Sequence, residues 1–175
     1  LIVVVILFGP ACGDSTGSDR TSLIFTATLD GVTWVADTVV GIASGSATDT
    51  TLSITGVRQV SPSLSHQVTL VLHAFRATGE FPLSDSAGVG IGAFSVDQTA
   101  GGVVVATTAY RTGTLQPGVL RITSIDRGDS LVSGTFAFEA AADPDTLPHR
   151  HLSGTFVVRF GFIPVYTVPL RDDAT

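Results

Sequence analysis

Apolar and polar residues alternate along most of the chain after residue 23. Runs in which every second position is apolar lie at residues 25–29, 68–74, 135–140 and 155–160, and threonine, serine or charged residues fill many of the positions between. Successive side chains of a β-strand point to opposite faces of a sheet, so this period of two predicts strands with one buried face. No segment offers the three-and-four spacing of an amphipathic helix.

Residues that favour turns separate these runs. Examples are Asp-Gly at 30–31, Gln-Pro-Gly at 116–118 and Arg-Gly-Asp at 127–129, because Gly and Asp tolerate positive φ and Pro presets a turn dihedral. Roughly ten short strands at this spacing predict an all-β fold, either an antiparallel β-sandwich or a partly open barrel, without substantial helix. We expect a single β-domain over residues 23–170, followed by a C-terminal tail at 171–175.

The tetrapeptide Ser-Gly-Thr-Phe occurs at residues 133–136 and again at 153–156. Each copy opens an aromatic strand of the same polarity. We therefore expect consecutive strands of one sheet, joined by a loop over residues 141–150. The glycine in each copy predicts a bulge or a close approach of the neighbouring chain where the strand begins.

The first residues carry a targeting pattern. An apolar run, Leu1–Phe8, is too short to span a bilayer as a helix and precedes Ala11 and Cys12, the only cysteine of the chain. This arrangement resembles a bacterial lipoprotein signal. The resemblance implies a truncated signal peptide at residues 1–11, cleavage before Cys12, a lipid on that cysteine and a flexible tether at residues 12–22.

The same resemblance implies an address. The membrane is then a partner through the lipid on Cys12, and Gly13 after it carries no signal for retention in the inner membrane, which favours the outer membrane of the cell envelope. Two alternatives stay open: an ordinary cleaved signal or a short membrane anchor, each with Cys12 as a free thiol.

A second resemblance covers most of the chain after the tether. It rests on the segments Phe25–Gly31 with Trp34, Gly79–Leu83, Gly118–Thr123 and Ser133–Phe138. These segments resemble an uncharacterised family of bacterial lipoprotein β-domains. The resemblance implies a fold and an envelope location, and it implies no catalytic residues.

Composition narrows the range of functions. The 175 residues are 44% hydrophobic, enough for one domain with a core, and the formal net charge of -6 argues against nucleic acid as a partner. The sequence contains no Gly-x-Ser-x-Gly, no His-Glu-x-x-His and no second cysteine. These absences favour a non-catalytic protein, although a hydrolase built from separate loops stays an alternative, since a catalytic triad is a spatial arrangement.

Two groups of side chains are candidates for binding. Trp34 and Tyr110 are amphipathic aromatics that could stack on a glycan or peptide if they reached a shared groove, and the alternative is that they pack in the core. His149 and His151 flank an arginine at a spacing that places both imidazoles on one face of a strand, but the full ligand set of a zinc site is missing. We therefore predict no metal and no other cofactor.

Taken together, these observations predict a lipid-anchored cell-envelope β-domain that is non-catalytic and serves in binding or structure. Its expected partners are the membrane, through Cys12, and an envelope protein or a glycan. The first alternative is a β-sandwich that binds a glycan or a small apolar ligand. The second alternative is the loop-based hydrolase.

Overall fold

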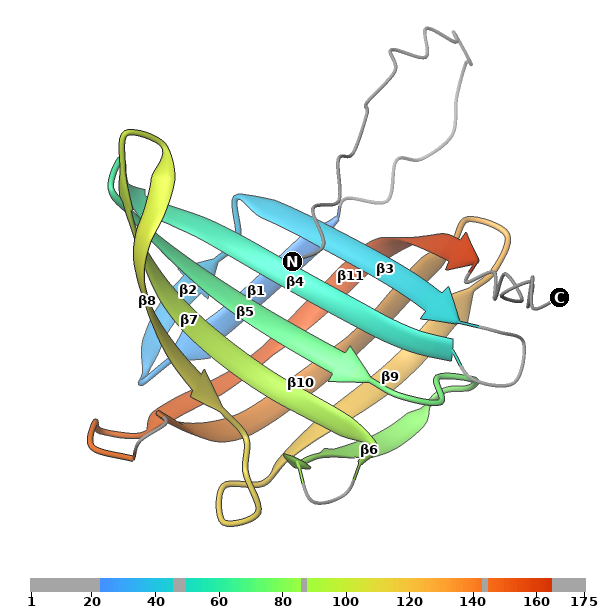
Figure 1. The fold of residues 1–175 in the computed structure, drawn as a ribbon. Helices are drawn as coiled ribbons and strands as arrows, with labels where there is room; N and C mark the ends of the chain where they lie inside the picture. Colours follow the sequence, from blue (N-terminus) through green and yellow to red (C-terminus); the bar gives the residue numbers. More distant parts are fainter. Residues whose placement is uncertain (1–22, 46–49, 86–87, 143–144, 165–175) are drawn as a thin grey trace, which may run out of the picture.

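The protein is described by a computed structural model that covers residues 23–45, 50–85, 88–142 and 145–164 (Figure 1). These residues form eleven strands and no long helix, which confirms the all-β fold. Within them, no helix has the length and apolar character needed to cross a membrane. The strands are β1 (Ile24–Leu29), β2 (Val32–Val35), β3 (Thr38–Gly45), β4 (Thr50–Ser61), β5 (Leu64–Leu72), β6 (Gly79–Leu83), β7 (Gly90–Ala100), β8 (Val103–Arg111), β9 (Gly118–Asp126), β10 (Leu131–Ala142) and β11 (Arg150–Pro164).

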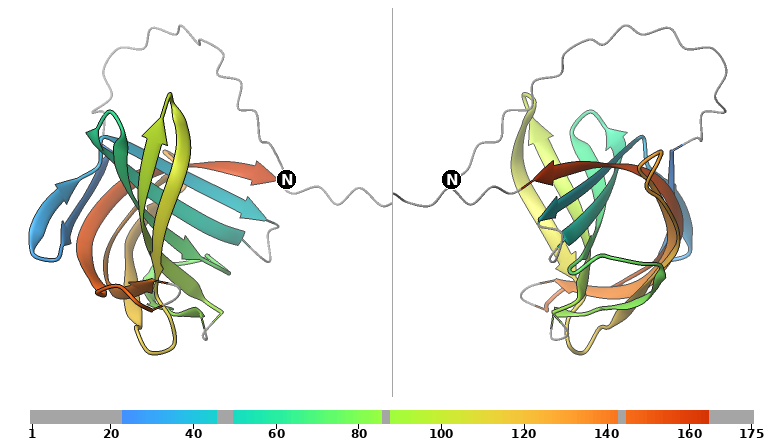
Figure 2. Two further views of the ribbon diagram at one scale, coloured as in Figure 1. Left: turned by 60° about the vertical axis from the view of Figure 1, so that its left-hand side comes forward. Right: turned by 90° about the vertical axis from the view of Figure 1, so that its right-hand side faces the viewer.

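The strands form one mixed sheet that curves around a common interior (Figure 2). Its order is β2-β1-β11-β3-β4-β5-β7-β8-β10-β9-β6, and β11 also pairs with β10, so the pairings return to β11. The ring is not a clean barrel, because β8 joins β10 through only two residue pairs, Arg111 with Ala141 and Tyr110 with Ala142. Of the two expected architectures, the sheet is nearer to the partly open barrel.

Two features differ from the expected antiparallel array of short strands. The end of β11, from Phe160 to Pro164, pairs with β3 in parallel. Several strands are also long, up to fifteen residues in β11. β11 is long because it changes neighbours along its length. Its first part pairs with β1 and β10, and its last part pairs with β3.

The interior of the curved sheet is the hydrophobic core. Every second residue is buried over residues 52–56 of β4, 68–72 of β5 and 90–94 of β7, as a period of two requires. Each fully buried large side chain contributes about 1.5–3 kcal/mol relative to exposure. The largest fully buried side chains are Phe25, Phe94, Phe156, Leu52, Ile54, Leu70, Leu72, Leu83, Leu120, Ile122, Val68 and Val132.

The repeated tetrapeptide lies where β10 and β11 pair. Gly134 is opposite Phe156 and Phe136 is opposite Gly154, so each glycine faces the phenylalanine of the other copy. A Cβ at Gly154 would meet the carbonyl oxygen of Thr26 and lie 2.8 Å from Cζ of Phe136. A Cβ at Gly134 would lie 2.7 Å from Cζ of Phe156. The expected close approach at each glycine is therefore present. It leaves room for the ring of Phe136 to lie over Gly154 and for the ring of Phe156 to lie over Gly134.

Candidate functional site

The β1–β2 hairpin is attached to the start of β11 through its turn. Asp30 and Gly31 have φ values of 50° and 83°, as the type I′ turn of a two-residue hairpin requires. The Asp30 carboxylate accepts hydrogen bonds from the backbone N–H of His151 at 2.9 Å and from Nη1 of Arg150 at 2.7 Å. Burial by itself would raise the pKa of Asp30, but these two donors outweigh it and lower the pKa. The hairpin is thereby held over one end of the sheet.

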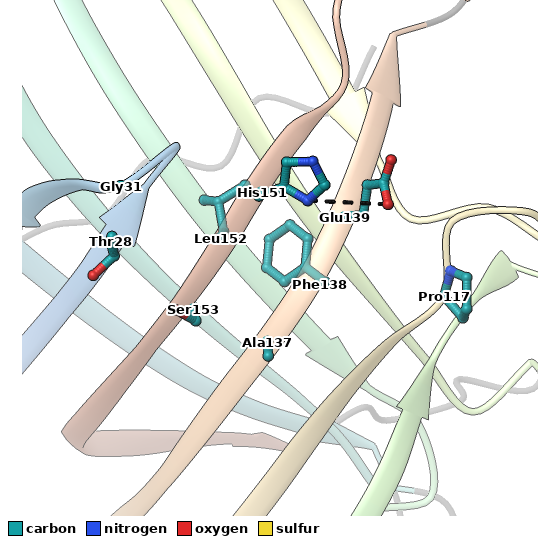
Figure 3. A pocket seen from close by; sticks show the side chains of 9 residues that line it. All are labelled: Thr28, Gly31, Pro117, Ala137, Phe138, Glu139, His151, Leu152 and Ser153. Carbon is teal, nitrogen blue, oxygen red and sulfur yellow. Dashed lines mark ion pairs between the residues drawn. The ribbon is translucent and has the colours of Figure 1, made fainter.

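A first cavity, the outer groove, lies on the outward face of β1, β10 and β11 (Figure 3). It is open and has a volume of about 400 Å³. Figure 3 shows Glu139 and His151 next to each other on neighbouring strands, with Thr28 on the other side of the groove. The lining residues are Thr28, Gly31, Pro117, Ala137, Phe138, Glu139, His151, Leu152 and Ser153.

A histidine bridges two carboxylates beside the outer groove. Nδ1 of His149 lies 2.6 Å from Oε1 of Glu139, and Nε2 lies 3.1 Å from Oδ1 of Asp145. The hydrogen bonds to Glu139 and then to Asp145 raise the pKa of His149, because both carboxylates favour the protonated imidazole. His151 is more distant, with Nδ1 4.0 Å from Oε2 of Glu139. The contacts therefore link the β10–β11 loop to β10.

This arrangement bears on the metal and hydrolase candidates. Because both ring nitrogens of His149 face carboxylates, neither offers a free lone pair, and the described residues contain no group of three or more His, Cys, Asp or Glu that could hold a metal ion. In the same residues, no hydroxyl hydrogen-bonds to His149, and His73 contacts the Thr51 hydroxyl at 3.3 Å with no carboxylate beside it. In this part of the chain, a nucleophile, base and orienting acid do not meet at His149 or His73.

A second cavity, the hairpin cavity, lies between the β1–β2 hairpin and the β4–β5 hairpin. Its volume is about 160 Å³. Its lining residues are Leu29, Val32, Thr33 and Trp34 from the first hairpin and Arg58, Val60 and His66 from the second. Nη1 of Arg58 donates a long hydrogen bond of 3.4 Å to the carbonyl oxygen of Thr33, which connects the two sides.

Trp34 and Tyr110, the predicted ligand-binding aromatics, are both buried. Trp34 is 2% exposed and packs edge-to-face on Phe25, with ring centroids 5.8 Å apart. Tyr110 is 4% exposed and lies under Arg150, whose guanidinium carbon is 5.4 Å from the ring centroid. Neither ring face is open to a sugar. Trp34 nevertheless lines the hairpin cavity, and among the described residues its Nε1 is a buried donor without a hydrogen-bond partner.

Two arginines, Arg58 and Arg150, act on His66 at the hairpin cavity. Arg58 is opposite His66 in the β4–β5 register. Burial lowers the pKa of His66, and the charges of Arg58 and Arg150 lower it further, so the imidazole stays neutral at neutral pH. Arg150 also carries a buried Nε that has no hydrogen-bond partner among the described residues. The unsatisfied atoms at this end of the sheet are therefore donors.

Neither Arg58 nor His66 is among the binding residues that the sequence predicts, although the alternation holds a signal for both. Arg58 continues the buried face of β4 after Leu52 and Ile54, and His66 precedes Val68 on the buried face of β5. A polar side chain in phase with the apolar face of a strand is unusual. That they meet each other and Trp34 depends on which strands pair, and the alternation does not reveal this.

The predicted lipidation site lies outside the described residues. Cys12, the signal peptide at 1–11, the tether at 12–22 and the tail at 171–175 all fall in this category, as do residues 165–170 of the expected domain. The lipid anchor and the domain boundaries therefore stay predictions.

Comparison with known proteins identifies a family but no activity. A family model described as a domain of unknown function, DUF6252, matches residues 21–158. No curated protein and no solved structure matches the chain significantly. The match spans the described strands up to the middle of β11 and includes the residues of the hairpin cavity.

Proposed function

Because the chain belongs to the DUF6252 family of domains of unknown function, we propose a role from its own chemistry: a lipid-anchored, non-catalytic β-domain of the bacterial cell envelope that binds a small ligand. The observation that supports binding is the hairpin cavity, where Arg58, His66 and Trp34 lie together and where, among the described residues, the buried Nε1 of Trp34 has no hydrogen-bond partner. Buried donors are nearly always satisfied in folded proteins, so a buried indole N–H without a partner beside a cavity calls for an acceptor from outside the described residues, a water or a ligand. In the described residues no hydroxyl bonds to His149, and the Thr51 hydroxyl beside His73 has no carboxylate to complete a triad, which favours binding over hydrolysis.

The envelope location rests on the resemblance of the first residues to a lipoprotein signal. One acyl chain holds a protein only weakly, whereas two or more hold it persistently, so a lipidated Cys12 would keep the domain at a membrane. The outer membrane is favoured over the inner membrane because of Gly13.

The anchor is tested by phase partition. The full chain, expressed behind an intact leader, is expected to enter the detergent phase, and the Cys12→Ala variant or globomycin treatment is expected to leave a larger precursor or an aqueous protein. If the variant has the same mobility and the same partition as the wild type, the anchor is rejected.

Binding is tested by thermal unfolding of the purified full chain with small molecules of each charge class and with envelope glycans. A ligand that binds only the folded state raises Tm, by mass action. We expect at least one compound to raise the Tm of the wild type and to raise the Tm of Arg58→Gln by less. If no compound raises Tm, the proposed binding function is wrong.

A further inference from the structure

Arg58 holds an unpaired positive charge at the hairpin cavity. Its one hydrogen bond in the described residues is the long contact to the Thr33 carbonyl, and no carboxylate pairs with it there. A guanidinium has five N–H donors in a planar fork that matches the two oxygens of a carboxylate. Taking this charge partly out of water without a partner is costly. The remaining N–H donors of Arg58 can therefore bind an acceptor that enters the cavity.

The neighbouring polar groups have the same preference. Nε1 of Trp34 is a donor only, and leaving such a buried N–H unpaired costs about 1–3 kcal/mol. The cavity lining contains no Asp or Glu. Of the carboxylates near this end, Asp30 is already bonded to Arg150 and to the backbone of His151, and Asp37 accepts from the backbone N–H of Gln59 at 2.7 Å. An anion in the cavity would therefore meet the guanidinium of Arg58 and no acidic side chain in the lining.

Apart from Thr33 and His66, the rest of the lining is apolar. Leu29, Val32 and Val60 complete the cavity, and Val32 and Val60 are 69% and 46% exposed. The volume of about 160 Å³ is smaller than the roughly 300–1,000 Å³ of sites for drug-sized ligands. The cavity therefore suits a small molecule, or one end of a larger one, with an apolar part beside its charge.

We propose that the hairpin cavity binds a monocarboxylate with a short alkyl chain, its carboxylate at Arg58 and its chain against Leu29, Val32 and Val60. This inference rests on the proposed binding function and names the class of ligand. Inorganic phosphate fits less well because it would leave the valines unmatched. A neutral alcohol fits less well because it would leave the charge of Arg58 without a counter-charge.

Trp34 provides a direct measurement, because it is the single tryptophan of the chain. The full-length protein in non-ionic detergent should give one indole cross-peak in a two-dimensional proton–nitrogen NMR spectrum. We expect butyrate and hexanoate to shift this peak saturably and to change the tryptophan emission. Inorganic phosphate, butan-1-ol and butylammonium serve as controls for charge and for the alkyl chain.

Variants connect the signal to the cavity. Arg58→Gln should raise the apparent Kd about tenfold or more, which corresponds to a loss of about 1.4 kcal/mol or more in binding free energy. Arg58→Lys keeps the positive charge but lacks the planar guanidinium, so its Kd should lie between those of the wild type and Arg58→Gln. Arg159→Gln is the matched control, because Arg159 lies on the outward, exposed side of β11 and makes no ion pair among the described residues; it should leave the Kd unchanged.

The outcomes separate this inference from the broader proposal. A shift by phosphate alone, or equal shifts by butanol or butylammonium, overturns the monocarboxylate and leaves a binding domain. Equal affinity in Arg58→Gln, with its Tm intact, also overturns the inference. No shift by any of these compounds overturns it as well. If glycans or other molecules then still raise Tm, the binding function stands.

Discussion

At the scale of single residues, glycines decide how close the aromatic rings come to the backbone. Gly134 and Gly154 each face a phenylalanine on the neighbouring strand, and the Cβ of any other residue would overlap that ring. The same relation joins Gly92 to Phe138, where a Cβ would lie 2.9 Å from Cδ1 of the ring. The interior is thus filled by large rings set against strands that lack side chains at those points.

This packing predicts the effect of one methyl group. Gly154→Ala places a Cβ against the Thr26 carbonyl and the Phe136 ring, so we expect a loss of about 1–3 kcal/mol or more in the free energy of unfolding, measured with urea. Gly161→Ala, on the same strand, is the control, because a Cβ there meets nothing within 4 Å. Equal losses in both variants would contradict the packing argument.

Asp30 provides a second prediction at this scale. Asp30→Asn keeps the shape of the turn but removes the charge that pairs with Arg150, so we expect a loss of about 1 kcal/mol near neutral pH. Since the folded pKa of Asp30 is lowered, its charge stabilises the protein above the ordinary carboxyl pKa, and this contribution is lost as the pH falls through the folded value. Urea unfolding at neutral and acidic pH should show the difference shrinking in acid. Asp129→Asn, at an exposed turn, should change little.

At the scale of elements, the β10–β11 hairpin joins the core to the outer groove. Its inward-facing residues include the two pairs of a glycine and a phenylalanine described above, and its outward-facing residues include Glu139 and His151. The loop between the two strands contributes His149, which is bonded to Glu139 on the preceding strand and to Asp145 within the loop. The protonated form of His149 therefore helps to hold the loop against β10.

The hairpin should consequently respond to pH. The folded pKa of His149 is raised, so its protonation stabilises the fold fully below the unfolded value, about 6.5, and the contribution is lost as the pH rises through the folded value. The Tm difference between wild type and His149→Gln should be larger near pH 6 than near pH 9. The change in this difference should fall within the pH range over which an imidazole titrates. A difference that stays constant or grows with pH would contradict the ion pairs. His151→Gln, which removes only a 4.0 Å contact, should have the smaller effect.

At the scale of the whole molecule, the sheet is unequally supported along its ring. β10 pairs on both sides with β9 and β11 over most of its length. β8 pairs with β7 throughout, but on its other side the described residues supply only the two pairs with β10. The far end of β8 also exposes Val103, Val104 and Val105. Among the described residues, β8 is therefore the strand of this ring with the fewest backbone pairings.

Hydrogen exchange should show this gradient. We expect amides of Val103–Ala109 to exchange about tenfold or more faster than those of Leu131–Ala140, because local opening costs less where few apolar contacts must break. Mass spectrometry of the full chain after timed exchange measures both segments in one sample. Equal protection would show that the ring opens as a unit.

The alternation of apolar and polar residues located runs that lie in β1, β5, β10 and β11, because a period of two is a local property of the chain. It correctly places Phe25, Val68, Leu70, Phe136 and Phe156 on the buried face. The Ser-Gly-Thr-Phe repeat likewise predicts that β10 and β11 are neighbours with a close approach at glycine. The parallel pairing of β11 with β3 could not be predicted in this way, since it joins segments more than a hundred residues apart.

The candidate site divides along the same line. That Trp34 is amphipathic and that Arg58 and His66 interrupt apolar faces are facts of the sequence. That Trp34 and Tyr110 are covered, that both nitrogens of His149 meet carboxylates, and that Arg58 and His66 share a cavity with Trp34 were decided by the tertiary structure. The physical reason is that side-chain periodicity selects which residues turn inward, whereas only the pairing of distant strands selects which of them meet.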